Sequence, residues 1–152
     1  MKIEKVTFKD LKQIAYLEKK VFNENAFSEG LIINLIKNKA LFLKLEKGKL
    51  IKRIIGFIVV IKDKNDRANI VNFLIDPKYR NRGYGSLLLQ NAINKIKMVK
   101  GIKKIILNVQ ISNSSAINLY EKFNFKKNPN ILENYYQSGE SAFLMELKLA
   151  ST

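Results

Sequence analysis

The sequence of 152 residues contains no cysteine and no histidine. Without cysteine there is neither a disulfide framework nor a thiolate metal site. Without histidine the chain lacks the commonest general base and the commonest metal ligand among protein side chains. Any chemistry must therefore use carboxylates, tyrosine, backbone groups or water, and we expect no metal.

Long apolar runs are also missing. Hydrophobic residues make up 47% of the chain, which excludes disorder, but no stretch approaches the ~18 residues that a membrane span needs. Residues 1–7 alternate as in a β-strand and lack the apolar centre of a signal peptide. We therefore expect a cytoplasmic protein with no membrane partner.

Acidic residues are few, since 13 Asp and Glu stand against 28 Lys and Arg, for a formal net charge of +15. A surplus of this size favours an anionic partner, such as nucleic acid, a ribosome or a polyphosphate cofactor. The lysines are scattered along the sequence rather than gathered in one run. Solvated surface accounts for most of them, so the class of partner stays open.

The order of apolar segments predicts a single domain over residues 1–149 with a short tail at 150–152, because no linker or low-complexity tract interrupts it. Periodicity predicts strands at 2–7, 40–46, 54–62, 68–75 and 103–109, a brief one from 125, and a last one at 141–149. Helices are predicted at 11–23, after Ser28, at 83–99 and after Asn113, with a loop at 128–139. The order β-α-α-β-β-β-α-β-α-β-β predicts an α/β (α+β) fold, a mixed sheet with helices on both faces.

One stretch combines a buried strand, a basic turn and a glycine-rich helix start. The strand ends at Asp76, and the chain enters the next helix through Gly83 and Gly85. The first amides of a helix lack intrahelical partners and carry the positive end of the helix dipole, so this point suits an anion. Glycine lets the backbone approach the anion, and Arg80 and Arg82 can add charge-assisted hydrogen bonds.

This motif specifies only Arg80, Gly83 and Gly85, and a plain glycine turn between strand and helix is an equal alternative. A P-loop would need Gly-x-x-x-x-Gly-Lys-Ser/Thr, which the chain does not contain. A dinucleotide fingerprint would need a third glycine where Leu88 stands. The phosphate motif that remains is a pyrophosphate turn of another kind.

Two motifs together resemble one family. Residues 76–85 (Asp-Pro-Lys-Tyr-Arg-Asn-Arg-Gly-Tyr-Gly) and residues 113–125 (Asn-Ser-Ser-Ala-Ile-Asn-Leu-Tyr-Glu-Lys-Phe-Asn-Phe) resemble the GNAT superfamily of acetyl-CoA-dependent N-acetyltransferases. The resemblance extends over essentially the whole chain. It implies the GNAT fold, whose central sheet is mixed, mostly antiparallel and about seven strands wide, and it implies acetyl-CoA as cosubstrate.

Two further stretches resemble the branch that acetylates protein N-termini, namely RimI-like enzymes and catalytic subunits of NatA type. Residues 134–145 are similar to the loop and last strand of that branch, and Phe22–Asn25 to its substrate-side loop. The resemblance implies direct transfer of an acetyl group to the α-amine of a peptide or protein N-terminus. It leaves the oligomeric state and any auxiliary subunit open.

The resemblance also implies residues that hold the cosubstrate. Backbone groups on one strand would pair with the amides of pantetheine, as an added strand does: Phe73, Leu74 and Ile75. The pyrophosphate would be held by the turn and the start of the helix: Arg80, Asn81, Arg82, Gly83, Tyr84, Gly85 and Ser86. Asn113 would hydrogen-bond the pantetheine arm, although asparagine at this place also suits an ordinary helix cap.

On the acceptor side, the resemblance implies that Tyr120 faces the thioester sulfur as general acid. Because an ordinary phenol (pKa ~10) is a weaker acid than a thiol (~8.5), we expect it to donate a hydrogen bond rather than transfer its proton fully. Tyr135 and Tyr136 would line the acceptor groove, and Glu24 would sit at its mouth. The structural alternatives are a core tyrosine at 120, loop aromatics at 135 and 136, and a solvated Glu24.

The chain departs from the family at the general base, because the strand position where RimI-like enzymes often carry glutamate is Asn108. The attacking amine must be uncharged, which is far easier for an α-amine (pKa ~7.7–8.0) than for lysine (~10.4). We expect Asn72 and Asn108 to hold a water that relays the proton to bulk solvent or to Glu24. A glycine customary in the second motif is Asn124, which can adopt positive φ.

Two other functions stay open. The same fold could act on a small amine, such as a polyamine or aminoglycoside, or on a protein lysine. A peptide acceptor needs an open groove at residues 135–139, whereas a small amine needs a closed acidic pocket. Alternatively, the basic surface could dock on ribosomal RNA with weak or absent catalysis, which a salt-dependent RNA affinity would reveal.

Overall fold

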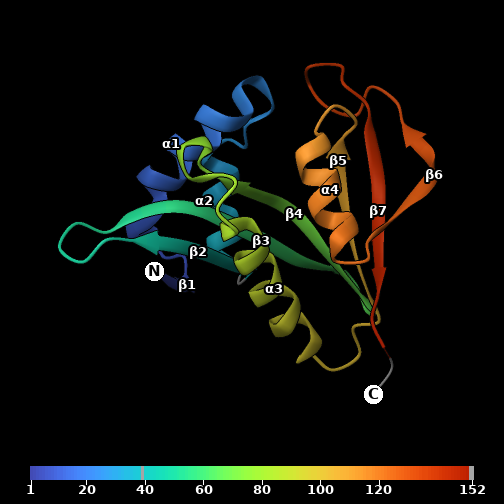
Figure 1. Ribbon diagram of the computed structural model, residues 1–152, viewed down its shortest axis with the longest axis horizontal. Helices are drawn as coiled ribbons and strands as arrows, with labels where there is room; N and C mark the ends of the chain where they lie inside the picture. Colours follow the sequence, from blue (N-terminus) through green and yellow to red (C-terminus); the bar gives the residue numbers. More distant parts are fainter. Residues whose placement is uncertain (39, 151–152) are drawn as a thin grey trace. The chain divides into compact units, whose positions relative to one another are not determined.

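The computed structural model describes residues 1–38 and 40–150, which contain seven strands and four α-helices (Figure 1). In chain order these are β1 (Lys2–Lys5), α1 (Leu11–Phe22), α2 (Glu29–Lys37), β2 (Leu41–Lys47), β3 (Arg53–Lys64), β4 (Arg67–Ile75), α3 (Tyr84–Lys97), β5 (Lys104–Gln110), α4 (Ser114–Lys122), β6 (Lys126–Leu132) and β7 (Ala142–Lys148). Short 3-10 turns are η1 (Phe8–Asp10), η2 (Asn23–Asn25) and η3 (Pro77–Tyr79). The predicted order of elements is confirmed.

The seven strands form one sheet in the order β1-β2-β3-β4-β5-β7-β6. β4 and β5 are parallel, with a register that runs from Arg67↔Lys104 to Ile70↔Leu107. The pairs β1–β2, β2–β3, β5–β7 and β6–β7 are antiparallel. A parallel pair needs a crossover connection, which α3 supplies. The mixed, mostly antiparallel sheet expected from the sequence is confirmed.

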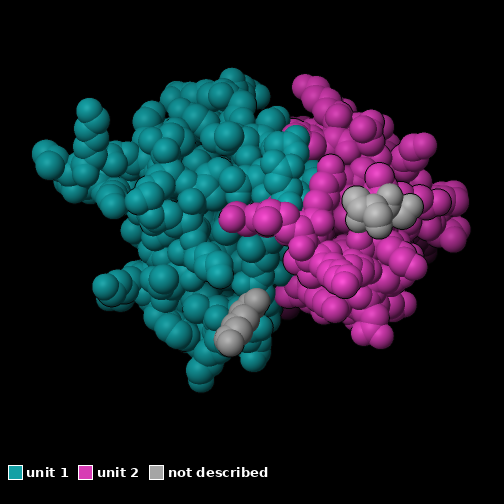
Figure 2. Space-filling view, turned by 90° about the horizontal axis from the view of Figure 1, so that it is seen from below, with its two compact units in different colours: residues 1–60, 72–94 teal, residues 61–71, 95–152 magenta. Residues whose placement is uncertain are grey.

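The chain divides into two compact units (Figure 2). Unit 1 comprises residues 1–60 and 72–94, and unit 2 comprises residues 61–71 and 95–152. β3, β4 and α3 each contribute residues to both units. A single domain over 1–149 stays a prediction, and of the expected tail at 150–152 only Ala150 lies among the described residues.

The core of unit 1 lies on both faces of its strands. Residues 54–60 of β3 are all buried, and successive side chains of a strand point to opposite faces. The apolar stripes of α1 and α3 are buried as well: Ile14, Leu17, Leu88, Leu89, Ala92 and Ile93. Each large aliphatic side chain buried in this way stabilises the fold by about 1.5–3 kcal/mol. Helices on both faces, as the sequence predicts, explain why residues 54–60 of β3 have no polar side.

At Gly56 the backbone of β3 lies very close to the end of β4. A Cβ atom at this position would lie 2.5 Å from Cδ1 of Ile75 and 2.8 Å from the carbonyl oxygen of Leu74. Next to it, the amide of Asp76 donates a hydrogen bond to the carbonyl of Ile55 at 2.7 Å. Only a residue without a side chain permits this approach. The contact holds β3 against the point where β4 ends and the basic turn begins.

Unit 2 is built around β5, which pairs with β7 along its full length, from Lys104↔Lys148 to Gln110↔Ala142. On α4, Ile117 and Tyr120 are buried, and the ring of Tyr120 packs against Phe125 with centroids 5.7 Å apart. Asn124 between α4 and β6 has a φ of 71°. The expectation that Asn124 replaces a glycine at a positive-φ position is confirmed.

The prediction of a loop over 128–139 is wrong for its first part. Residues 126–132 form β6, and Ile131 and Leu132 pair with Phe143 and Ala142 of β7. The turn-type sequence Asn128-Pro129-Asn130 misleads because β6 is an exposed edge strand with a register shift between Lys127 and Ile131. Edge strands tolerate proline, since one side of the backbone needs no partner.

Candidate active site

The basic turn of unit 1 presents a row of amide donors at the start of α3. Asn81 and Gly83 have positive φ angles of 61° and 84°. Among the hydrogen bonds of the described residues, none is donated by the amides of residues 81–86, and Leu87 is the first to bond back, to the carbonyl of Gly83 at 3.0 Å. Nothing lies within 4 Å of a Cβ placed on Gly83. A turn with free donors and with open space at Gly83 has what an anion needs.

Contacts within unit 1 hold the side chains of the two arginines of the turn. Nε of Arg80 donates to the carbonyl of Ile75 at 2.9 Å. The guanidinium of Arg82 lies over the ring of Tyr79, 5.6 Å from its centroid, and the ammonium of Lys47 lies 5.4 Å from the same centroid. Arg80 uses one of its five N–H donors to close the turn, which leaves the others for a ligand.

Asp76 ties the end of β4 to α1. Its carboxylate is buried and accepts hydrogen bonds from Nζ of Lys20 and from the amide of Lys78, both at 3.1 Å. Burial by itself would raise the pKa of Asp76, but the bonds from Lys78 and Lys20 outweigh it and hold the pKa below its usual range. The ionised carboxylate therefore fixes the strand end from which the turn starts.

A buried carboxylate that the sequence did not point to lies on α1. Glu18 is 1% exposed; one oxygen accepts from Nδ2 of Asn72 at 2.6 Å and the other from the amide of Phe27 at 3.0 Å. Burial raises the pKa of Glu18 although both hydrogen bonds act to lower it. The spacing could have indicated this burial, because Glu18 stands four residues after Ile14 and therefore shares the buried face of the helix.

The Glu18 contacts bear on the expected water site and on the substrate-side loop. The side-chain nitrogen of Asn72 donates a hydrogen bond to Glu18, a contact that the expectation of a water held by Asn72 did not foresee.

The substrate-side loop is anchored at its far end. The hydrogen bond from the amide of Phe27 to Glu18 fixes the segment after η2, and Ser28 caps α2 by accepting from the amide of Leu31, as predicted. Glu24 within η2 is exposed, which fits the mouth of an acceptor site and equally a solvated carboxylate.

In unit 2 the two expected acceptor tyrosines pack on each other beside Asn108. The rings of Tyr135 and Tyr136 meet edge to face, with centroids 4.9 Å apart and planes at 87°. Nδ2 of Asn108 donates to the hydroxyl of Tyr135 at 2.9 Å. The loop is closed by a tight turn in which Gly139, at a φ of 85°, donates to the carbonyl of Tyr136 at 2.8 Å. Tyr135 remains 51% exposed.

The carbonyl oxygen of the Asn108 side chain is buried and has no hydrogen-bond partner among the described residues. A buried acceptor left without a donor costs about 1–3 kcal/mol. Such an atom in a folded protein calls for a donor from water or a ligand. The position where the family often has a base therefore carries an acceptor poised for an N–H or O–H group.

Tyr120 is 6% exposed. Burial raises the pKa of its hydroxyl, and the neighbouring charge of Tyr136 acts in the same direction. The pKa of Tyr136 is raised to about 12, first by burial and then by Tyr135 and Glu140. Both phenols therefore stay protonated near neutral pH and can act as hydrogen-bond donors.

The helix-cap interpretation of Asn113 is confirmed, since its Oδ1 accepts a hydrogen bond from the amide of Ala116 at 3.2 Å at the start of α4. The cap uses the oxygen alone. Nδ2 is the atom that a contact with pantetheine would use, so that expectation stays a prediction.

The expected site residues fall into two groups. Unit 1 contains Glu24, Phe73, Leu74, Ile75 and residues 80–86. Unit 2 contains Asn108, Asn113, Tyr120, Tyr135 and Tyr136. Within residues 1–38 and 40–150, no helix has the length and apolar character to cross a membrane, and no three Asp or Glu side chains gather as a metal site would require.

Known proteins resemble the chain in sequence and fold. An N-alpha-acetyltransferase of Sulfurisphaera tokodaii is 39% identical over 83 residues, which are 55% of this chain and 49% of the relative. The ribosomal protein bS18-alanine N-acetyltransferase of Salmonella typhimurium is 35% identical over 88 residues, 56% of this chain and 58% of the relative. The chain thus spans about half the length of the curated relatives that it matches.

A solved structure extends the similarity to nearly the whole chain. The crystal structure of the ribosomal-protein-S18-alanine N-acetyltransferase from Escherichia coli has a TM-score of 0.84 and 26% identity, covering 99% of this chain and 95% of that one. The sequence profile of the acetyltransferase (GNAT) family matches residues 8–125. Because this match includes more than half of the residues, and both expected motifs lie within it, the chain belongs to the GNAT acetyltransferase family.

Proposed function

We propose that the chain transfers an acetyl group from acetyl-CoA to the N-terminal α-amine of a peptide or protein. The observation that carries the proposal is the row of amides at residues 81–86, which donate no hydrogen bond among the described residues. Membership of the GNAT family supports coenzyme A as the ligand, and its diphosphate is the anion that this row would hold. The names of the bacterial and archaeal relatives favour an α-amine as acceptor.

The cosubstrate would be held mainly by backbone groups. Amides of residues 81–86 donate to the diphosphate, supported by the remaining N–H groups of Arg80 and by Arg82. The backbone of residues 73–75 pairs with the amides of pantetheine, and Nδ2 of Asn113 donates to the same arm. The fit is favoured by Gly83, because the space before it is open and a side chain there would enter it.

The reaction forms a bond between the acceptor nitrogen and the acetyl carbon, and it breaks the bond between that carbon and sulfur. Coenzyme A leaves as the thiolate, and the proton lost by nitrogen passes to water. Tyr120 assists by donating a hydrogen bond to the sulfur, since its raised pKa keeps the phenol protonated. The buried oxygen of Asn108 accepts from the water that receives the proton.

The acceptor would lie against the loop of Tyr135 and Tyr136. Half-exposed Tyr135 is held by Asn108, so the acceptor wall and the buried oxygen belong to one contact network in unit 2. In unit 1, Glu18 anchors the loop that contains Glu24. The site has no histidine, and an α-amine, which is partly uncharged at neutral pH, needs less help from a base than lysine does.

A cytoplasmic location and docking on the ribosome belong to the same proposal. The substrate named for the Salmonella relative is a ribosomal protein. A net charge of +15 would attract a protein to the anionic surface of ribosomal RNA. Co-sedimentation with ribosomes at rising salt tests this part separately from catalysis.

The decisive experiment is acetyl-CoA turnover against short peptides that differ in their first residue. We expect turnover with free α-amines and at least a hundredfold lower kcat/KM with N-terminally blocked lysine peptides and with spermidine. Faster turnover of a blocked peptide or of the polyamine would instead assign the chain to the small-amine or lysine-acetylating members of the fold. Absence of coenzyme A binding by calorimetry would remove the enzymatic proposal.

A further inference from the structure

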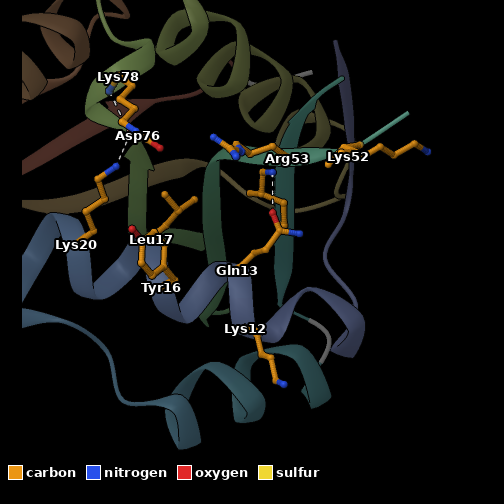
Figure 3. Close-up of a pocket in the computed structure, with 11 residues that line it drawn as sticks. Lys12, Gln13, Tyr16, Leu17, Lys20, Lys52, Arg53, Asp76 and Lys78 are labelled. Atoms are coloured by element: carbon orange, nitrogen blue, oxygen red, sulfur yellow. Dashed lines mark hydrogen bonds and ion pairs between the residues drawn. The ribbon is translucent and has the colours of Figure 1, made fainter. Parts of the chain in front are cut away.

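A strongly basic groove lies on unit 1, with a volume of about 640 Å³ (Figure 3). Its cationic lining comes from three parts of the chain, namely α1, the start of β3 with the residue before it, and η3: Lys12, Lys20, Lys52, Arg53 and Lys78. Asp76 is the single carboxylate in the lining. Neither the anion turn at 81–86 nor the acceptor tyrosines line this groove.

The negative charge in the groove is already compensated. Asp76 accepts a hydrogen bond from Lys20 at 3.1 Å, and this pair is drawn in Figure 3. No ion pair among residues 1–38 and 40–150 involves the other four cations, Lys12, Lys52, Arg53 and Lys78. Five cations and one carboxylate line the groove, and this excess of positive charge favours an anionic ligand.

Two hydrogen bonds between lining residues hold the groove in shape. Oε1 of Gln13 accepts a hydrogen bond from the amide of Ile54 at 3.0 Å, which joins α1 to the start of β3. The Lys20–Asp76 pair joins α1 to the end of β4. A ligand would therefore meet a preformed surface and would not have to order it.

An aromatic side chain stands among the cations. Tyr16 is 67% exposed, and it lies four residues from Lys12 and four from Lys20 on α1 (Figure 3). Residues at this spacing share one helix face, one turn apart. Proteins bind single-stranded nucleic acid with surfaces of this kind, on which cations contact the phosphates and aromatic rings stack on the bases.

We infer that this groove binds single-stranded nucleic acid, with Lys12, Arg53 and Lys78 contacting phosphates and Tyr16 stacking on a base. The exposed ring favours nucleic acid over an acidic protein, because acidic side chains offer no planar partner for stacking. The inference goes beyond acetyl transfer and does not require it. It assigns the nucleic-acid strand to one defined location on the basic surface of unit 1.

The test measures fluorescence anisotropy of a labelled oligouridylate of about 12 nucleotides with the full chain at several salt concentrations. The groove variant is Lys12→Gln/Arg53→Gln/Lys78→Gln. The matched control is Lys9→Gln/Lys19→Gln/Lys37→Gln, which removes the same charge from exposed positions of unit 1 outside the groove lining. All six side chains are exposed, so both proteins should fold, and circular dichroism verifies it.

We expect the groove variant to bind at least tenfold more weakly near ~0.1 M salt. Its salt slope should fall by about 2, because each phosphate contact on a single strand contributes about 0.7. The control variant should lose less than threefold in affinity and keep its slope. Tyr16→Ala should weaken binding at least fivefold, while Tyr16→Phe keeps the ring and should bind like the natural chain.

Four results would overturn the inference. Equal losses in the two triple variants would mean that only net charge matters. Displacement of the oligonucleotide by acetyl-CoA would mean that the groove belongs to the cosubstrate site. Binding of polyglutamate as tight as that of the oligonucleotide, or indifference to Tyr16→Ala, would assign the groove to an acidic protein. Equal losses, tight polyglutamate binding and indifference to Tyr16→Ala can all occur with acetyl transfer intact and do not bear on the proposed enzyme. Displacement by acetyl-CoA would in addition move the proposed cosubstrate site.

Discussion

The carboxylate of Glu18 and the side-chain nitrogen of Asn72 lie 2.6 Å apart in the interior of unit 1. Through this contact and the bond from Phe27, a single buried carboxylate joins α1, β4 and the loop that contains Glu24. A charged residue is rarely buried unless its partners satisfy it. The Glu18 contacts therefore support the region on which we place the acceptor mouth.

Glu18→Ala should lower the free energy of unfolding by about 2–4 kcal/mol, because it leaves the Asn72 amide and the Phe27 N–H buried without an acceptor. Chemical denaturation measures the change. Glu121→Ala removes an exposed glutamate from α4 and should change stability by less than about 0.5 kcal/mol. Similar changes in the free energy of unfolding for the two variants would show that the buried contacts do not stabilise the fold.

Stability should rise with pH through the titration of Asp76. The folded-state pKa lies below the usual 3.8 because bonds from Lys78 and Lys20 prevail over burial. The unfolded chain therefore binds more protons in this range, and the stabilisation is present above pH 3.8 and lost as pH falls through the folded-state pKa. Denaturation at several pH values between acid and neutral should show that the free energy of unfolding rises less steeply with pH for Asp76→Asn than for the natural chain. An equal dependence on pH would refute the assignment.

Tyr120→Phe should lower kcat tenfold or more and leave the dissociation constant of coenzyme A near normal. The hydroxyl is proposed to stabilise charge on the sulfur only as the bond to carbon breaks, so its loss acts on the transition state. Because the pKa of Tyr120 is raised, the natural enzyme should show no loss of activity from this group up to pH ~10. Equal losses in kcat and coenzyme affinity would point to a structural role, and Tyr16→Phe controls for removal of an exposed hydroxyl.

Gly83→Ala should weaken binding of coenzyme A at least tenfold. Open space surrounds the position that a Cβ on Gly83 would take, and we expect a methyl group there to obstruct a diphosphate held by the amide row. Gly101→Ala is a matched control, since Gly101 also has positive φ, at 90°, and no atom within 4 Å of a Cβ position. Both variants should lose a similar ~1–2 kcal/mol of stability from backbone strain. Calorimetry should find weakened coenzyme binding for Gly83→Ala alone, and equal weakening in both would contradict the amide row as the diphosphate site.

Asn108→Ala should reduce kcat about tenfold and change the pH dependence of the rate, because it removes the buried acceptor proposed to hold the relay water. Tyr135→Phe is the control, since it removes the partner of Nδ2 and leaves the oxygen in place. Steady-state kinetics across pH compares the two. A pH profile unchanged by Asn108→Ala would exclude that water from the mechanism.

Much of the fold could be predicted because local rules and tertiary packing agree. The caps at Ser28 and Asn113 depend on side chains that bond to amides only a few residues away. Positive φ at Asn124 also follows from a local preference. The length of β6 was not predicted: the brief strand expected from residue 125 continues to Leu132. A proline with two asparagines is typical of a turn, and only pairing with β7 makes this segment a strand.

The sequence by itself determined the order of elements, the glycine turn at the start of α3 and the family, because these depend on neighbours in the chain and on residue spacing. Only the tertiary structure revealed the burial of Glu18 against Asn72, the unpartnered oxygen of Asn108 and the raised pKa of Tyr120. It also brought Tyr16 and cations from three parts of the chain to one groove. The reason is physical: burial and proximity set the energy of a polar group, and residues distant in sequence create both.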